Sequence, residues 1–420
     1  MCYAIPGKIV SISGHKAVID YFGEKKSAFA DCSINIGDYV YAQGGVVVDK
    51  IRKVDAKKIL SFWKNKFLEL EQRDNELAKK IKGSDSFEAI FSKIQNGKPL
   101  NRNDVNTILH ANPYANGKNV KALRSFANVL RKKKLKNSCC VHGIIEFSNY
   151  CRMNCAYCGI RSGAEIKRYR MSEHEIILAA EGAVKLGFKA IVLQSGEDYF
   201  YTKEMLTRIV KKIKRMRVLI CLSLGERDIK LYKALYNVGA KAVLLRFETS
   251  NKELYKRIRP GKRLMDRIAL IKKLQKIGYL VSTGFLIGLT GENKDDLIGN
   301  IMLSKKLKPD VYSFGPYIET NPNIKCNASL NTCLNTISFV RVLDNNAKIL
   351  VTTALETLSP QAKKLGLLAG GNSLMIDVTP EKYARFYSLY PGKFMETEKK
   401  IKETISLLNS LGRAPIDLGR

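Results

Sequence analysis

The sequence predicts an α/β protein in which a (β/α)8 barrel of the TIM type follows a small all-β barrel and a helical connecting region. Two observations predict this fold class. From residue 143 onward, eight short apolar runs alternate with helical patterns, as they do in a closed parallel barrel. Before residue 53, short alternating runs are separated by glycines, which is typical of a small β-barrel.

The small barrel comes first in the chain. Its strand candidates are the runs KIVSI, KAVIDYF and YVYAQGGVVV, which resemble an OB-like arrangement. After residue 55, apolar residues recur at helical spacing among many charges, and Gly83 can end that helix. We therefore expect three regions: a small β-barrel with a trailing helix over 1–83, a helical lead-in over 84–136, and the (β/α)8 barrel over 137–420.

The large barrel needs eight strands, and the sequence offers eight. The candidates are GIIEFS (143–148), AIVLQS (190–195), VLICLSL (218–224), AVLLRFE (242–248), LVSTGFLIG (280–288), VYSFGPY (311–317), ILVTTAL (349–355) and SLMIDV (373–378). In this fold the functional residues lie where strands end and the following loops begin. The functional residues are therefore expected at the ends of these eight runs.

Composition excludes some classes of protein. No run of 18 apolar residues appears and the N-terminus lacks the features of a signal peptide, so we expect a cytoplasmic protein without a membrane partner. The formal net charge is +33, which suggests a nucleic-acid partner. The lysines are dispersed, however, and only residues 131–134 form a tight basic run. We therefore do not expect nucleic acid as the partner.

Three cysteines directly after the first barrel strand give the strongest signal. Cys151, Cys155 and Cys158 have the spacing C-x-x-x-C-x-x-C, which can hold three irons of a 4Fe–4S cluster. The fourth iron is then open to S-adenosylmethionine (SAM), and electron transfer to its sulfonium yields a 5′-deoxyadenosyl radical. Structural zinc prefers four ligands, usually in two pairs, and no second CxxC pair is present. The spacing therefore predicts a radical SAM enzyme.

Other strand ends offer groups that SAM could contact. Glu197 ends the second strand, where a carboxylate can receive the SAM ammonium group, and the glycines of segment 284–292 permit close backbone approach to an adenine. Arg246 and Glu248 alternate along LLRFET, so both side chains are expected on one strand face. They could form a structural ion pair or bind a ligand.

Segments across residues 84–410 together resemble the HydE family of FeFe-hydrogenase maturases. The motifs that carry the resemblance are IIEFSNYCRMNCAYCGIRS, LQSGED, LSLGER, LLRFETSN, GFLIGLTG, FGPYI, TTALETL and LYPGK. The resemblance implies SAM at the top of the barrel above a deep cavity. It also implies radical attack on the sulfur ligand of an iron–carbonyl–cyanide intermediate, delivered as a cysteine complex by a partner maturase.

The resemblance assigns residues motif by motif. Cluster ligands are Cys151, Cys155 and Cys158; cofactor contacts are Tyr157, Glu197, Ser223, Arg246, Glu248 and Arg267; cavity residues are Gln194, Cys221, Thr352, Thr353 and Tyr390. The predicted catalytic residues are Arg246 and, in the small barrel, Cys2. Three positions depart from the family. Phe247 replaces a His, Glu356 replaces a Gly, and the FGPYI segment continues into residues 319–322 without the usual Pro-His-Pro.

The first 80 residues resemble a second family, the HypC chaperones of NiFe-hydrogenase assembly. The signature is MCYAIPGK, followed by AVID and GDYV. The resemblance implies that Cys2 holds an iron–carbonyl–cyanide unit through its thiolate, a ligand that suits such iron. Gln43 stands where these chaperones usually carry a His. We expect the tether to hold Cys2 near the mouth of the large barrel.

Together the two resemblances predict a fused maturase that works with other hydrogenase maturation proteins. The main alternative is a radical SAM mutase acting on a small amino acid, similar to methylornithine synthase. A non-enzymatic iron carrier with an idle barrel and an RNA-modifying enzyme are further alternatives. Whether Cys139, Cys140, Cys326 or Cys333 binds a second metal stays open at this point.

Overall fold

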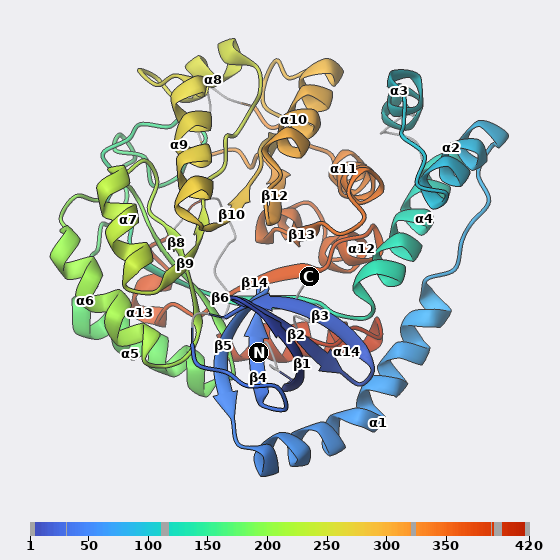
Figure 1. Ribbon diagram of the computed structural model, residues 1–420. Coiled ribbons are helices and arrows are strands. Elements are labelled where there is room, and N and C mark those ends of the chain that lie inside the picture. Colours follow the sequence, from blue (N-terminus) through green and yellow to red (C-terminus); the bar gives the residue numbers. More distant parts are fainter. Residues whose placement is uncertain are drawn as a thin grey trace.

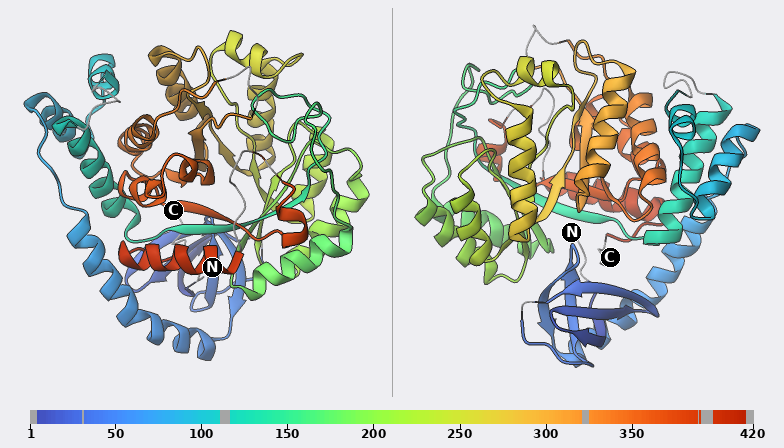
Figure 2. Two further views of the ribbon diagram at one scale, coloured as in Figure 1. Left: turned by 180° about the vertical axis from the view of Figure 1, so that it is seen from behind. Right: turned by 45° about the horizontal axis from the view of Figure 1, so that its top comes forward.

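The computed structural model describes residues 5–30, 32–110, 117–320, 325–387, 389 and 397–415. It contains a small closed barrel and a large one, joined by a helical region (Figure 1). In the right-hand view of Figure 2 the small barrel lies below the large one.

The small barrel has five strands in the closed order β1-β2-β3-β5-β4. They are β1 (Gly7–Ser13), β2 (Lys16–Tyr21), β3 (Glu24–Phe29), β4 (Tyr39–Gln43) and β5 (Val46–Ile51). Branched side chains such as Ile9, Ile19 and Val40 are fully buried inside it, as alternation along each strand requires. The predicted small all-β barrel is confirmed.

Helices connect the two barrels. They are α1 (Lys53–Leu77), α2 (Asp85–Gln95), α3 (Arg102–His110) and α4 (Lys118–Leu135). Helix α4 packs against α11 (Leu330–Leu343) on the side of the large barrel. The domain boundaries at residues 83 and 136 remain predictions.

The large barrel is a ring of parallel strands in chain order, and all eight predicted runs contribute to it. The strands are β6 (Cys140–Ser148), β7 (Ala190–Ser195), β8 (Leu219–Ser223), β9 (Ala240–Leu244), β10 (Leu280–Thr283), β11 (Leu286–Ile287), β12 (Val311–Pro316), β13 (Lys348–Val351) and β14 (Ser373–Asp377). Pairing of β14 with β6 and of β10 with β12 closes the ring. The predicted (β/α)8 barrel is confirmed.

Helices cover the outside of the large barrel (Figure 1). Besides α11, they are α5 (Glu173–Lys185), α6 (Lys203–Lys214), α7 (Ile229–Asn237), α8 (Lys252–Ile258), α9 (Leu264–Ile277), α10 (Lys294–Leu307), α12 (Ala362–Leu368), α13 (Glu381–Ala384) and α14 (Thr397–Ser410). Local sequence starts several of them. Ser172 and Glu175, for example, form a reciprocal capping box at α5.

Two barrel strands are shorter than the sequence suggests. The fifth run is split into β10 and β11 at Gly284, where a Cβ would lie 2.0 Å from the Ser313 carbonyl oxygen. The fourth run stops at Leu244, and Glu248 beyond it adopts a left-handed backbone with φ of 68°. Both interruptions lie at the upper ends of the strands, where the loops form the mouth.

The small barrel closes the floor of the large barrel, the end at which the strands begin. Val48 packs against Ala190, Leu219 and Ala242 near the starts of three strands, and Asp49 pairs with Arg217 at 2.8 Å. At Gly44, in the β4–β5 turn, a Cβ would lie only 3.0 Å from Leu219. The small barrel thus lies at the end opposite the mouth, because its turn fits the apolar ring of side chains there. Cys2, which was expected near the mouth, lies outside the described residues.

A buried ion network ties the connecting region to the C-terminal segment. The Asp74 carboxylate of α1 accepts two hydrogen bonds of 2.7 Å from Arg131 of α4 and lies 3.3 Å from the Arg413 guanidinium. All three side chains are at most 1% exposed. Among the described residues, no helix combines the length and the apolar character needed to cross a membrane.

Candidate active site

A cavity of about 290 Å³ opens at the mouth of the large barrel. The predicted residues Cys151, Cys155, Tyr157, Cys158, Gln194, Glu197, Ser223, Arg246, Glu248, Arg267, Thr352 and Thr353 all line it. They come from separate barrel strands and the loops that follow, which meet at this end of the fold. The structure therefore brings together nearly all of the residues that the sequence singled out.

The three cysteines lie on the loop after β6. Cys155 is 8% exposed, and Cys151 and Cys158 are partly buried. The Cys151 sulfur accepts hydrogen bonds from the backbone N–H groups of Met153 and Glu197, at 3.4 and 3.3 Å. Burial raises the pKa of all three thiols, that of Cys158 to about 12. A bound cation is needed to hold them as thiolates, since an iron centre deprotonates its cysteine ligands.

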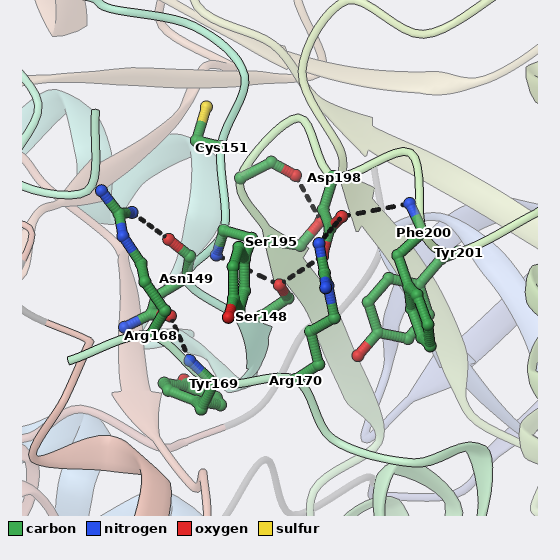
Figure 3. Close-up of polar contacts among 12 residues, drawn as sticks. Ser148, Asn149, Cys151, Arg168, Tyr169, Arg170, Ser195, Asp198, Phe200 and Tyr201 are labelled. Atoms are coloured by element: carbon green, nitrogen blue, oxygen red, sulfur yellow. Dashed lines mark hydrogen bonds and ion pairs between the residues drawn. The ribbon is translucent and has the colours of Figure 1, made fainter. Parts of the chain in front are cut away.

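The cysteine loop is held by hydrogen bonds between its backbone and nearby side chains. Arg168 donates to four carbonyl oxygens, among them those of Asn149 and Ile160 at 2.5 and 2.9 Å. Asn149 in turn accepts from the Tyr169 N–H at 2.7 Å (Figure 3). These hydrogen bonds therefore hold the cysteine loop in place without a contribution from a bound ligand.

Asp198, which the sequence analysis did not single out, joins this loop to the loop after β7. Its carboxylate accepts from the Ser148 hydroxyl at 2.7 Å and from Arg170 at 2.7 and 3.0 Å (Figure 3). Burial raises the Asp198 pKa, but the hydrogen bonds from Arg170 and Ser148 outweigh burial and lower it. Figure 3 shows the Cys151 side chain extending away from this network.

A second charged network lies on the far side of the cavity. The buried Arg259 guanidinium donates to Glu226 at 2.8 Å and lies 3.5 Å from Glu197. Arg267 also donates to Glu226, at 3.0 Å. Burial raises the Glu226 pKa, but Arg267, Arg259 and Lys262 outweigh it and keep the carboxylate ionised. Sequence analysis missed Arg259, whose only local signal is its place at the end of α8 before Pro260.

Arg246 and Glu248 face the cavity together. Their side chains approach to 3.2 Å with an angle that makes no hydrogen bond, so the Glu248 Oε2 atom is buried without a hydrogen-bond partner. The other Glu248 oxygen accepts from the Tyr157 hydroxyl at 3.3 Å. Strand alternation is not the reason for this arrangement, since β9 has already ended at Leu244. The unsatisfied oxygen is instead available to a donor on a ligand.

The deeper wall holds the predicted cavity residues. Ser223 donates to Gln194 at 3.2 Å and Gln194 donates to Glu146 at 3.1 Å. The Thr352 hydroxyl is buried without a hydrogen-bond partner. Cys221 faces inward as predicted, but it borders a smaller cavity at the barrel floor, where burial raises its pKa to about 12. Cys2 and Tyr390 lie outside the described residues.

Two of the three positions that depart from the HydE pattern have structural explanations, and the third, segment 319–322, lies partly outside the described residues. Phe247 is fully buried and packs against Phe285, so its side chain belongs to the barrel core. Glu356 pairs with Lys363 at 3.1 Å. The glycines that were expected to approach an adenine are already required by the protein, because a Cβ at Gly288 would lie 2.2 Å from the Ala328 nitrogen.

The residues fit a cluster with one open iron and a SAM molecule beside it. Three thiols meet the same cavity, and two backbone N–H groups already point at one sulfur, as is usual for a thiolate ligand. One Glu248 oxygen and the Thr352 hydroxyl lack hydrogen-bond partners, as expected of groups that face a ligand. Within the described part of the chain, no three His, Cys, Asp or Glu side chains are grouped around a single-ion site.

Two family models match the chain. The HupF/HypC family model matches residues 1–63, and the radical SAM superfamily model matches residues 145–302. The FeFe-hydrogenase maturase subunit HydE of Thermotoga maritima is 36% identical over 301 residues, covering 70% of this chain and 86% of that protein. The 3-methylornithine synthase of Methanosarcina barkeri is 26% identical, covering 79% and 95%.

Solved structures share the fold. The crystal structure of methylornithine synthase has a TM-score of 0.70 at 25% identity and covers 78% of this chain and 97% of that one. The FeFe-hydrogenase maturase HydG of Carboxydothermus hydrogenoformans has a TM-score of 0.64 at 19% identity, covering 81% and 83%. The second likeness concerns the fold alone.

Proposed function

Since the chain belongs to the HydE family of radical SAM maturases and carries a HupF/HypC domain at its N-terminus, we propose that it acts in assembly of the FeFe-hydrogenase cofactor. Its substrate in this proposal is an iron–carbonyl–cyanide unit with a sulfur ligand, and the radical attacks that sulfur. Cys2 of the small barrel holds or delivers the iron unit. The partners are then the maturase that makes the iron–cysteine complex and further hydrogenase maturation proteins.

One observation carries the enzymatic part of the proposal. The three cysteines and the Arg246–Glu248 pair line the same cavity, which continues down to Gln194 and Thr352. The same cavity would therefore hold SAM beside the cysteines and expose it to groups on the deeper wall. Enclosure of that cavity by barrel strands keeps water from a reactive intermediate.

Each group has a defined task in this proposal. When bound, the cluster would supply the electron that splits the SAM sulfonium. Cys151, Cys155 and Cys158 hold the cluster, and Glu248 accepts a hydrogen bond from the SAM amine or ribose. Arg246 offers its guanidinium to the SAM carboxylate. Ser223 would be a further SAM contact, and Gln194 and Thr352 would orient the substrate in the deeper part of the cavity.

The test is anaerobic SAM cleavage by the reconstituted, reduced protein, with and without the iron–cysteine complex. The proposal predicts that 5′-deoxyadenosine formation rises sharply when the complex is present. Slow cleavage that the complex does not change would contradict the proposed substrate while leaving the radical enzyme. Absence of cleavage, with the cluster verified by spectroscopy, would favour the idle-barrel carrier.

A radical SAM mutase on a small amino acid is the second candidate. It is favoured by the match to methylornithine synthase and by two carboxylates in the cavity wall, Glu146 and Asp377, which could pair with a diamino substrate. The same cleavage assay with lysine in place of the iron complex separates the two candidates. Stimulation by lysine alone would favour the mutase.

The carrier role of Cys2 has its own test. Cys2→Ser is expected to lower hydrogenase maturation while leaving the barrel cluster in place. The matched control is Cys32→Ser, an exposed cysteine of the same small barrel. Maturation that is equal in Cys2→Ser and wild type would remove the carrier role from the proposal.

A further inference from the structure

An exposed patch of aromatic and arginine side chains lies beside the cysteine loop. Tyr199 and Phe200, which follow β7, are each 51% exposed, and Tyr150 is 37% exposed. The Arg152 guanidinium lies over the Tyr199 ring, 4.7 Å from its centre. The Arg170 guanidinium lies 3.8 Å from the centre of the Tyr150 ring and 4.7 Å from that of Phe200. Both arginines are exposed as well, and we call these five side chains the rim patch.

The protein itself fixes the rim patch. The Asp198 carboxylate accepts hydrogen bonds from the Arg170 side chain and, at 3.1 Å, from the Phe200 N–H (Figure 3). The buried Arg227 guanidinium lies 4.3 Å from the centre of the Tyr199 ring and donates to the Asp198 carbonyl at 2.8 Å. A surface that is already ordered loses less conformational entropy when a partner binds, so the rim patch is prepared for binding.

The rim patch borders Cys151 but lies outside the mouth cavity. Cys151 lines that cavity, whereas none of the five rim-patch residues does. Tyr150 and Arg152 are the neighbours of Cys151 in the chain, and the Arg152 N–H donates to the Glu197 carbonyl at 3.2 Å. A protein that binds the rim patch is therefore one peptide unit from a predicted cluster ligand, and it does not need to enter the cavity.

The residue types of the rim patch suit a protein partner with an acidic surface. Tyrosine, phenylalanine and arginine are enriched at the centres of protein–protein interfaces. A guanidinium group pairs with a carboxylate through two parallel hydrogen bonds, so Arg152 favours Asp and Glu on the partner. Lys167 adds a further exposed cation, because its carbonyl accepts from the side chain of Asn149, the residue before Tyr150.

We propose that the rim patch docks an acidic electron-donor protein, a small iron–sulfur protein, which gives one electron to the cluster. This inference rests on the proposed function, because each cleavage of SAM consumes one electron. The donor is oxidised by one electron and the cluster is reduced by one, and no bond forms or breaks in this transfer. The maturase that brings the substrate is a different partner, since its cargo has to enter the cavity.

Single-stranded RNA is the other class of molecule that binds arginines interleaved with aromatic rings. The position of the rim patch favours the electron donor. An RNA strand gains nothing from lying beside Cys151, whereas an electron donor has to come close to the cluster.

Reduced plant-type ferredoxin is the probe, because it is a small acidic protein with a 2Fe–2S cluster of low potential. The full-length protein carrying its 4Fe–4S cluster is mixed anaerobically with this ferredoxin, without SAM, and the rate of cluster reduction is followed by absorption. Arg152→Glu should slow this reduction by about tenfold or more at low salt, because a reversed charge in an interface lowers the association rate. Tyr199→Ser and Phe200→Ser should slow it as well. Dithionite, a small chemical reductant, should reduce wild type and all variants to the same extent.

Arg102→Glu is the matched control, since it reverses an exposed cation of α3, across the large barrel from α5 and α6 (Figure 1). The control should accept electrons from ferredoxin at the wild-type rate. Wild-type rates in all three rim-patch variants would overturn the docking surface. It would also be overturned if ferredoxin failed to reduce a wild-type cluster that dithionite reduces.

Folding, RNA binding and enzyme activity are measured separately. Thermal melting shows whether each variant folds; if Arg152→Glu does not, Tyr199→Ser and Phe200→Ser decide the question. Binding of a fluorescent single-stranded RNA that Arg152→Glu abolishes, with ferredoxin rates unchanged, would assign the rim patch to nucleic acid and overturn the proposal.

SAM cleavage by dithionite-reduced wild type tests the proposed enzyme on its own. Cleavage together with unchanged ferredoxin rates in the variants would overturn only the docking surface. Ferredoxin-driven reduction that the variants slow, without cleavage of SAM, would overturn only the proposed enzyme.

Discussion

Glu248 combines three properties that are unfavourable for a purely structural residue. Its backbone is left-handed, its side chain is 4% exposed, and one carboxylate oxygen lacks a hydrogen-bond partner. A left-handed conformation at a residue other than glycine costs about 1–3 kcal/mol. This strained residue lies beside the cysteine loop, where the Tyr157 hydroxyl donates a hydrogen bond to its other carboxylate oxygen. Strain of this kind concentrates at ligand-binding positions.

Glu248→Gln is expected to weaken SAM binding. The amide removes the negative charge that a SAM donor would meet, and a hydrogen bond to a charged group contributes about 1.5–3 kcal/mol, which is about tenfold or more in affinity. The Kd for SAM is measured on the reconstituted protein, whose cluster absorption should be unchanged. Glu253→Gln, at an exposed position of α8, is the control. Equal affinity in Glu248→Gln and wild type would contradict the assigned contact.

The buried Glu292 makes the stability of the fold depend on pH. Burial raises its pKa to about 7, although the Gly288 N–H and the Asn300 amide donate to it. The folded state therefore binds more protons than the unfolded state between about pH 4.5 and 7, and this contribution to stability is lost as the pH rises through that window.

Glu292→Gln tests that dependence. The variant cannot titrate, so the free energy of unfolding of wild type minus variant should fall by about 3 kcal/mol between pH 4.5 and 7. Chemical unfolding at several pH values measures it. A constant difference across the window would contradict the raised pKa.

Sequence alone could predict the residues that occur in local motifs. The cysteine triplet and Glu197 were predicted because each follows a strand run within a few residues, and Arg246 because it alternates with Glu248 near the end of such a run. Arg259 could not be predicted, since its role depends on Glu226 and Glu197, which reach it from two other loops. The distant partners of a charged side chain leave no local pattern.

At the scale of elements, the turn after β8 positions Glu197. Gly225 has a φ of 70°, and a Cβ there would lie 2.3 Å from the Glu197 Cγ atom. The Glu197 carboxylate also accepts from the Glu226 N–H of the same turn at 2.9 Å. The turn after β8 and the loop after β7 therefore fix each other's position through Glu197.

Gly225→Ala should both destabilise the fold and displace Glu197. The left-handed backbone alone costs about 1–3 kcal/mol, and the clash lowers SAM cleavage further. Gly182→Ala in α5 is the matched control, because nothing lies within 4 Å of its Cβ position. That substitution should stabilise the protein by about 0.5–1 kcal/mol. Wild-type melting and cleavage in Gly225→Ala would contradict the role of the turn.

The number and order of barrel strands could be predicted because each is a short apolar run. Where the strands stop could not be predicted. At the break, Gly284 lies against the Ser313 carbonyl of a neighbouring strand, and the segment after β9 pairs with residues beyond β10, where the Glu248 carbonyl accepts from the Leu286 N–H at 2.8 Å. Both are set by packing between strands that are distant in sequence.

The stability of the whole molecule depends on the buried ion network of Asp74, which joins α1, α4 and the C-terminal segment. Asp74→Asn leaves Arg131 and Arg413 buried with less compensation, and removal of one partner of a buried ion pair costs about 3–5 kcal/mol. Denaturant unfolding measures the loss. The control is Asp266→Asn. The ion pair of Asp266 with Arg263 is exposed, so its loss should lower the free energy of unfolding by less than about 1 kcal/mol. Equal losses in the two variants would contradict the role of burial.

The presence of two barrels was predictable from the sequence, but the way they dock was not. The expected position near the mouth followed from the tether alone. The observed position depends on Gly44 and Val48 meeting residues at the starts of strands some 150 residues away or more. Such complementarity exists only once both surfaces have folded.

One contact at the end of the chain has a consequence for folding during synthesis. Ala414 is fully buried in the core of the small barrel, while its N–H donates to the Asn137 carbonyl just before β6. The ribosome therefore makes the strands of the small barrel long before it makes Ala414, a residue of their core. Until Ala414 has been made and has reached its place, the small barrel lacks one of its buried core residues.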